Sequence, residues 1–231
     1  MKKLIGGISL ALVLVGLSAA PAAAQLHGNA VYPAMPGTGV TVAADVALGM
    51  NDDAKISGTA GLESPMFIGG RVTLGLPMFS VWAGAGPTGI GVEGVDSEIT
   101  FGGGAGFHVL NAPMMPVTVS IQAGLGYLSE TGASLLNVTG GPLIVINVPS
   151  PGVSAKPWLM PRVQMTRISI DGLGSDSEVG FGASGGLMVT APMGLGVHAT
   201  LDWYTIGDPS VKPLHVSGGL HYKITVPSLG M

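Results

Sequence analysis

The residues of this chain that could do chemistry recur at every second position of alternating segments. In 214–224, for example, His215, Ser217, His221 and Lys223 share one side, and apolar residues occupy most of the other. This follows from strand geometry, because successive side chains point to opposite faces. Acids, bases and amides collected on one face predict a network of ion pairs and hydrogen bonds. The predicted polar network comprises Asp45, Arg71, Glu98, His108, Gln122, Arg162, Gln164, Glu178, His198, Asp202, His215, His221 and Lys223.

Three of the histidines raise the question of a metal site. His215 and His221 share a face, and His198 lies on the preceding segment. Six residues along a strand span roughly 20 Å at ~3.3 Å per residue, which is too far for joint coordination. A metal site would need cross-strand neighbours that the sequence does not establish, so we expect none. We expect no cofactor either, because the run 102–104 of three glycines lies within a strand pattern and no helix follows it.

A His-x-Ser element, His215-Val216-Ser217, resembles that of the outer-membrane lipid A deacylases. The resemblance covers three residues, the Arg-Tyr lead-in of that family is absent, and no acidic residue follows before Met231. A triad needs a nucleophile, a base and an orienting acid. We therefore expect no catalytic residues and no enzyme activity.

Ten alternating segments, separated by turn signals, carry these side chains. Three short Pro-Met turns (76–78, 112–114 and 191–193) recur between segments. Proline has no backbone N–H to donate to a strand ladder, so we expect these residues in turns between strands. Eight strands is the alternative if the second and seventh segments are irregular, and a bulge is expected near Arg167, where the alternation slips. The predicted strands are 40–48, 66–76, 78–86, 98–110, 117–127, 135–148, 153–170, 177–190, 194–204 and 214–224.

The composition indicates what surrounds this sheet. Charged residues make up 10% of the chain, which also has 39 glycines and no cysteine, whereas soluble domains carry about 25% charged residues. Beyond the N-terminal segment no apolar stretch is long enough for a membrane helix, so the apolar residues are spread over alternate positions, as in a transmembrane barrel. We predict an all-β, closed, up-and-down transmembrane barrel over 40–226. The alternative is a soluble periplasmic β-sandwich with a large core.

The N-terminus has the pattern of a cleavable secretion signal. Lys2 and Lys3 precede an apolar run over 4–17 and a small-residue cleavage site at 22–24. Removal of 1–24 leaves 207 of the 231 residues and, because two lysines and no acid are lost, changes the net charge from −4 to −6. Nothing basic enough for nucleic-acid binding is present. Residues 25–39 are expected to form an unpaired periplasmic lead-in, and 227–231 a C-terminal tail.

Aromatic residues gather near segment ends on the apolar face. Phe101 and Phe181 begin descending strands, while Tyr127 and Trp203 end ascending ones. All four are expected at the outer interface of a membrane, where aromatic rings are favoured. Tyr222, near the end of the last strand, would mark the inner interface.

The segments 117–127, 177–190, 194–204 and 214–224, together with the secretion signal, give the chain a resemblance to the small OmpA-like and OmpW-like outer-membrane barrels of diderm bacteria. The resemblance implies a location in the outer membrane, contact with its lipids, and insertion by the barrel-assembly machinery. Such proteins usually end on an aromatic residue, whereas here seven residues follow Ile224.

The function predicted from these features is that of an integral outer-membrane barrel with a polar lumen. A small barrel's interior is largely filled by side chains, so the role is structural or is limited to narrow passage of a small polar solute. One alternative is a surface protein that binds a partner, in adhesion for example, through its outer loops. The other is the soluble β-sandwich.

Overall fold

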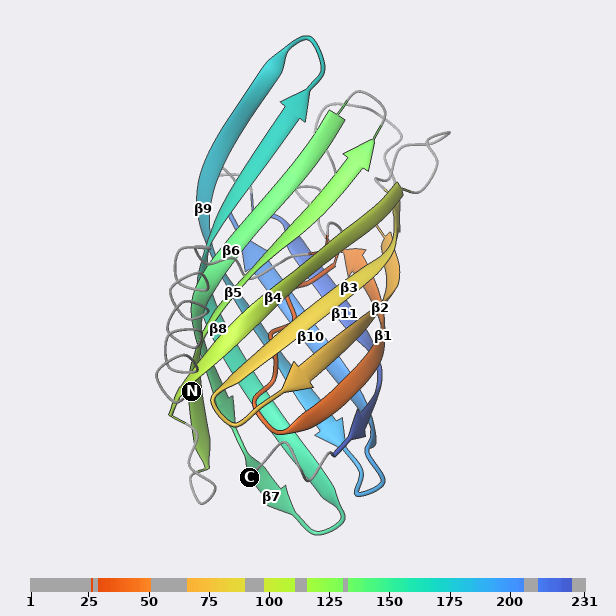
Figure 1. The fold of residues 1–231 in the computed structure, drawn as a ribbon, viewed down its shortest axis with the longest axis vertical. Helices are drawn as coiled ribbons and strands as arrows, with labels where there is room; N and C mark the ends of the chain where they lie inside the picture. The colour runs from red at the N-terminus through yellow and green to blue at the C-terminus, as the bar shows by residue number, and fades with distance from the viewer. Residues whose placement is uncertain are drawn as a thin grey trace, which may run out of the picture.

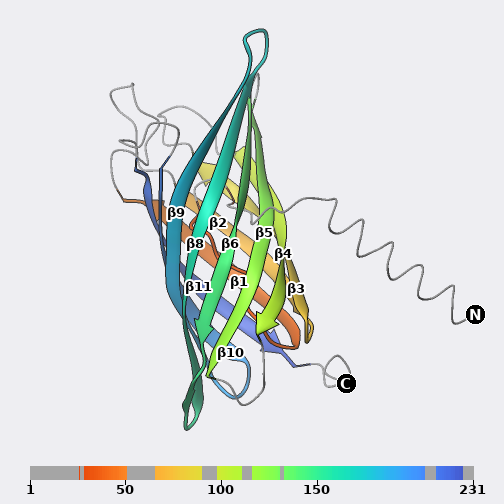
Figure 2. The same ribbon diagram turned by 90° about the vertical axis from the view of Figure 1, so that its left-hand side faces the viewer.

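The computed structural model describes residues 26, 29–50, 66–89, 98–110, 116–130, 133–205 and 212–225. Over these residues the regular elements are all antiparallel strands (Figures 1 and 2). No helix among them is long and apolar enough to cross a membrane. The strands are β1 (Gly39–Gly49), β2 (Met66–Gly75), β3 (Phe79–Gly89), β4 (Glu98–Leu110), β5 (Val117–Glu130), β6 (Ala133–Ile146), β7 (Val148–Ser150), β8 (Val153–Ile170), β9 (Gly174–Thr190), β10 (Leu195–Tyr204) and β11 (Leu214–Ile224).

The strands close into a barrel because the first and last of them pair with each other. β1 pairs with β2 on one side and with β11 on the other, in a register that places Val40 opposite Ile224. The remaining strands pair in chain order, with β6 joined to β8 beyond the short β7. A closed sheet has no free edge. The closed antiparallel barrel of ten strands is confirmed, and the eight-stranded and β-sandwich alternatives are wrong.

β7 extends β6 and does not add a strand to the barrel wall. Both strands pair with β8 in one register, interrupted at Asn147. The backbone N–H of Asn147 donates to the carbonyl of Pro116 at 2.6 Å. β7 and the start of β8 project past the other strands at the lower end of Figure 1, so the predicted strand 135–148 combines β6 with the start of this projection.

The bulge predicted near Arg167 is absent. β8 and β9 pair in one unbroken register over their shared length. The register shift that the described pairings do contain, between His108 and Leu110 of β4, lies against β5. Alternation is lost near Arg167 because β8 and β9 continue past the upper rim of the barrel (Figures 1 and 2). There Arg167 and Ile168, on opposite faces, are both exposed.

β10 shows how the barrel separates its two faces. Val197 and Leu201 are exposed, whereas His198, Thr200 and Asp202 are almost completely buried. A similar alternation of exposed and buried side chains runs along β1, β2 and β11. The outer surface is therefore apolar, whereas the inner face carries most of the buried polar side chains together with apolar ones such as Leu143 and Met160.

The lead-in runs through the inside of the barrel. Residues 26 and 29–38 join no strand pair, and the red-orange trace in Figure 1 follows them through the lumen. Leu26, Val31 and Ala34 are 3%, 1% and 0% exposed. The sequence pattern predicts an unpaired segment outside the barrel, on the periplasmic side. The structure corrects that placement.

Apolar contacts with inward-facing strand residues hold the lead-in there. Burial of its apolar side chains in the lumen removes them from water, which favours this position over an extended one in solvent. The two clusters are Val31 with Leu143, Val145, Trp158 and Met160, and Leu26 and Ala34 with Ala47, Phe67 and Trp82.

Three sequence predictions concern residues outside the described part of the chain. These are the secretion signal at 1–24, the C-terminal tail at 227–231 and the turn at 112–114. They remain predictions.

Closure between β1 and β11 can be tested with an engineered disulfide, because the chain has no cysteine. Ala47 and Ser217 lie opposite each other and both are buried. Opposite residues in an antiparallel pair lie about 4.5–5.5 Å apart, which a disulfide can span. We expect Ala47→Cys with Ser217→Cys to cross-link on oxidation, seen as a faster band on non-reducing gels after boiling.

The matched control pairs Ala47→Cys with Val216→Cys. Val216 is the neighbouring position on β11, and its side chain points to the outer face. Equal cross-linking of the two cysteine pairs would contradict the register.

Candidate functional site

The structure buries most of the predicted polar network inside the barrel. Glu98 and Lys223 are half-buried, at the start of β4 and the end of β11. Glu178 is exposed, which corrects its assignment to the lumen. The physical reason is that the described pairing of β10 with β9 ends at Gly182, so Glu178 lies on the part of β9 that extends past this pairing. The almost fully buried members are Asp45, Arg71, His108, Gln122, Arg162, Gln164, His198, Asp202, His215 and His221.

Asp45 is the centre of a first charged cluster. Its Oδ1 lies 3.1 Å from Nη2 of Arg71 and 2.6 Å from Nε2 of His198. These partners come from β2 and β10, so the contact with His198 crosses β11. Asp45 and His198 both lie opposite Gly219 of β11. Because Gly219 has no side chain, the carboxylate and the imidazole can meet over it.

Two more rings extend this cluster. The guanidinium carbon of Arg71 lies 3.8 Å from the centroid of the Tyr32 ring, a cation–π contact, and the ring centroids of Tyr32 and His198 are 4.7 Å apart. On the other side, Nδ1 of His221 lies 3.4 Å from Nδ1 of His198, and Nε2 of His221 lies 2.9 Å from the hydroxyl of Thr190. The lead-in therefore covers the charged cluster with an aromatic side chain.

Tyr32 is a site residue that the sequence analysis missed, because the lead-in was treated as a solvated connection. The available signal was composition. Leu26, Val31, Tyr32 and Met35 fall within a stretch of ten residues, whereas segments that stay in water are poor in apolar and aromatic residues.

Gln122 of β5 anchors the backbone of the lead-in. Its Nε2 donates to the carbonyl of Ala34 at 3.1 Å, and its Oε1 accepts from the N–H of Ala34 at 3.2 Å. The hydroxyl of Ser80 donates to the same carbonyl at 3.1 Å. Buried backbone groups are costly without partners, and here side chains of the wall supply them.

A second charged cluster joins β8, β9 and β10. Nη2 of Arg162 donates to both carboxylate oxygens of Asp202, at 2.8 and 2.9 Å, and the hydroxyl of Ser184 donates to Oδ1 of Asp202 at 2.6 Å. Arg162 also donates to Gln164. A charge buried in this way is tolerated only with a well-placed partner, and the row of residues across three strands provides it.

Glycines on the inner wall make room for large side chains. β4 and β9 carry several glycines on their inward positions, namely Gly102, Gly104, Gly106, Gly180 and Gly182. A Cβ at Gly104 would meet Trp82, one at Gly106 would meet Gln122, and one at Gly182 would meet Tyr204. The space beside these three glycines is therefore occupied by side chains of neighbouring strands.

The His-x-Ser element faces the lumen. His215 and Ser217 are both buried, and side chains two residues apart on a strand are separated by roughly 7 Å. Asp202 lies opposite His215 and so supplies, in space, an acid that does not follow in the sequence. Both oxygens of Asp202, however, accept hydrogen bonds from Arg162, and the ring of His215 stacks on Tyr204 at 5.9 Å.

The five predicted girdle residues all point outward. Phe101, Phe181, Trp203 and Tyr222 are exposed. Tyr127 is half-buried because its ring packs against Phe101, with centroids 5.4 Å apart.

Among the described side chains, no group of three His, Cys, Asp or Glu lies close enough to hold a metal ion.

Comparison with known proteins finds distant structural likenesses. No family model matches the chain, and no curated protein sequence matches it. The β domain of the Bordetella autotransporter BrkA is 12% identical, with a TM-score of 0.49, and the match covers 81% of this chain and 100% of that one. LpxR from Salmonella typhimurium is 9% identical, with a TM-score of 0.43 and coverage of 84% and 86%. The outer-membrane protease OmpT from Escherichia coli is 9% identical, with a TM-score of 0.33 and coverage of 81% and 94%.

The second charged cluster makes a testable contribution to stability. Asp202→Asn would leave the Arg162 guanidinium buried without its counter-charge, and breaking a buried pair in this way costs about 3–5 kcal/mol. We expect a loss of that size in the free energy of unfolding, measured by urea titration of the barrel in detergent with tryptophan fluorescence as the signal.

Asp176→Asn is the matched control, since Asp176 is exposed on β9 and its loss should change stability little. Adding Arg162→Met to Asp202→Asn should recover part of the loss, because the unpaired charge is then removed. Similar unfolding curves for the Asp202 and Asp176 variants would show that the cluster does not stabilise the barrel.

Proposed function

We propose that this chain is an integral outer-membrane β-barrel whose lumen is closed by its own lead-in, and that its role is structural. The observation that carries the proposal is the apolar outer surface. Each of the ten barrel strands places large exposed apolar side chains on its outer face, among them Val46, Ile68, Leu159, Leu201 and Leu220. Soluble monomers rarely expose contiguous apolar patches larger than a few hundred Å². A lipid environment removes this surface from water.

The closed hydrogen-bonded ladder supports the same proposal. Within a bilayer each backbone N–H and C=O needs a partner inside the protein, and closed barrels meet that need. The pairing of β1 with β11 completes the ladder around the barrel. The outward aromatic residues lie near strand ends or, for Phe181, beside the end of the neighbouring β10, as in the girdles of transmembrane barrels.

The contents of the lumen favour a structural role over an open pore. The lead-in crosses the interior, its backbone is bonded to Gln122 and Ser80, and Tyr32 lies over the Asp45 cluster. Passage of a small polar solute would require this segment to move. We propose no catalytic role, because His215 and Ser217 are buried in the lumen and the neighbouring Asp202 is paired with Arg162.

The lipid-facing assignment predicts a difference between two leucines. Leu220, in the middle of β11, is 61% exposed on the outer face, and Leu173, in the β8–β9 turn, is 83% exposed beyond the rim. An arginine on the lipid face of a barrel costs about 2–4 kcal/mol near the membrane midplane. We expect Leu220→Arg to lower the folded fraction strongly, measured by heat-modifiable mobility on SDS gels after membrane insertion.

Leu173→Arg is the matched control and should fold like the wild type, although its leucine is the more exposed of the two. If both variants fold equally well, the outer surface does not face lipid.

Closure by the lead-in predicts low conductance. In planar bilayers the wild-type barrel should pass little current, whereas deletion of residues 26–35 should give discrete openings at least several-fold larger, because the lumen then loses the segment that crosses it. Heat-modifiable mobility of the deletion variant shows that the barrel is still folded. Equal conductance of the folded wild type and the folded deletion variant would rule out closure by the lead-in.

A further inference from the structure

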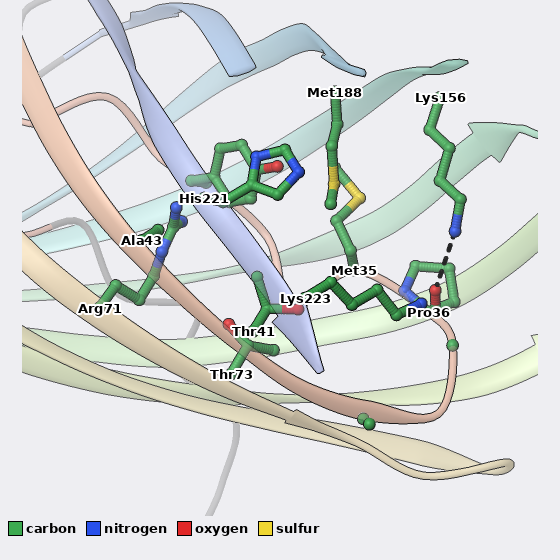
Figure 3. Close-up of a pocket in the computed structure, with 14 residues that line it drawn as sticks. Met35, Pro36, Thr41, Ala43, Arg71, Thr73, Lys156, Met188, His221 and Lys223 are labelled. Atoms are coloured by element: carbon green, nitrogen blue, oxygen red, sulfur yellow. Dashed lines mark hydrogen bonds between the residues drawn. The ribbon is translucent and has the colours of Figure 1, made fainter. Parts of the chain in front are cut away.

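Two lysines at the lower mouth of the barrel belong to neither charged cluster. Lys156 of β8 and Lys223 of β11 both line the hollow drawn in Figure 3. They also line an adjoining cavity of about 310 Å³. The hollow and the cavity are both lined by Lys156, Met188 and Lys223, so the two lysines lie at the boundary between them.

The ammonium groups of the two lysines converge. Figure 3 shows both side chains reaching toward Pro36, whose carbonyl accepts a hydrogen bond from Nζ of Lys156 at 3.4 Å. A Cβ on Gly37 would lie 3.2 Å from Nζ of Lys223 and 3.9 Å from Nζ of Lys156. Gly37 has a φ of 130°, a backbone conformation that residues with a side chain rarely adopt. The backbone of the lead-in therefore places no side chain at this point, which is within reach of both ammonium groups.

The surroundings are rich in hydrogen-bond donors. Arg71 and His221 line the same hollow as the lysines, and none of the described residues lining either space is an Asp or Glu. The described ion pairs involve neither Lys156 nor Lys223. Ser150 and Ser154 add hydroxyl groups to the wall of the larger cavity.

We propose that this mouth is a binding site for a phosphate group, held between Lys156 and Lys223. A phosphomonoester or free phosphate carries close to two negative charges and at least three acceptor oxygens. The two converging ammonium groups supply positive charge. The N–H groups of the lysines and the O–H groups of the serines supply hydrogen-bond donors. A carboxylate offers one charge and two oxygens, and would use this arrangement less fully. The site does not depend on the membrane assignment, because Lys156 and Lys223 are both half-buried inside the mouth of the barrel.

The test is a titration of the purified full-length barrel, in phospholipid-free detergent, with inorganic phosphate by isothermal calorimetry. The wild type should bind phosphate, and binding should weaken as ionic strength rises. Lys156→Met and Lys223→Met should each lower the affinity by about tenfold or more. Methionine keeps an apolar stem of similar length in place of the lysine stem, and unchanged heat-modifiable mobility of each variant verifies the fold.

Lys212→Met is the matched control, because Lys212 is exposed just before β11, at the opposite mouth. It should bind phosphate like the wild type. Absence of binding to the wild type, or equal loss in all three lysine variants, would overturn the proposal.

A second experiment separates the two sources of a phosphate group. The phosphate titration is repeated in nanodiscs of phosphatidylcholine alone and in nanodiscs that also contain phosphatidic acid, whose headgroup is a phosphomonoester. Unchanged affinity for inorganic phosphate identifies a free solute as the ligand. Affinity reduced only with phosphatidic acid identifies a lipid headgroup that reaches the same two lysines.

Discussion

The pairing of β1 with β11 is the constraint on which the rest of the structure depends. An open sheet with this alternation would leave two edges unpaired and its polar face open to solvent, whereas closure pairs both edges and encloses the polar face. Enclosure then brings together side chains that are far apart in the chain. Asp45 and His198 are separated by 153 residues in sequence, yet they share a hydrogen bond over Gly219. Every contact in the lumen between the first and last strands follows from that seam.

Enclosure also determines what the lumen can hold. Charges removed from water need partners, and the two charged clusters provide them with Asp45 between Arg71 and His198 and with Asp202 against Arg162. The inner wall is not polar throughout, because Phe67, Leu143 and Met160 also point inward. The lead-in matches this mixed wall, with apolar residues against the apolar patches and Tyr32 over the charged cluster.

The lead-in is also the feature that links the lumen to the lower mouth. Its backbone accepts hydrogen bonds from Ser80 and Gln122 within the barrel and from Lys156 at the mouth. A ligand that draws on Lys156 and Lys223 would therefore act beside the segment that closes the lumen. The proposed closure of the barrel to solutes and the proposed phosphate site would therefore involve neighbouring parts of one interior.

Most strands and their faces could be predicted from the sequence, with a closed barrel of ten strands favoured over one of eight, because the period of two is a local property of the extended backbone. Strands such as 98–110 and 214–224 could therefore be assigned to the residue. Local pattern failed where the environment changed along a strand, as beyond the rim at Arg167 and Glu178. The three-dimensional structure was needed to show which inward side chains meet and that the lead-in lies inside the barrel. The contacts between inward side chains depend on the register of strands that are far apart in the chain and on closure of the barrel. The position of the lead-in depends on the free energy of burying it against an inner wall that exists only once the barrel has closed.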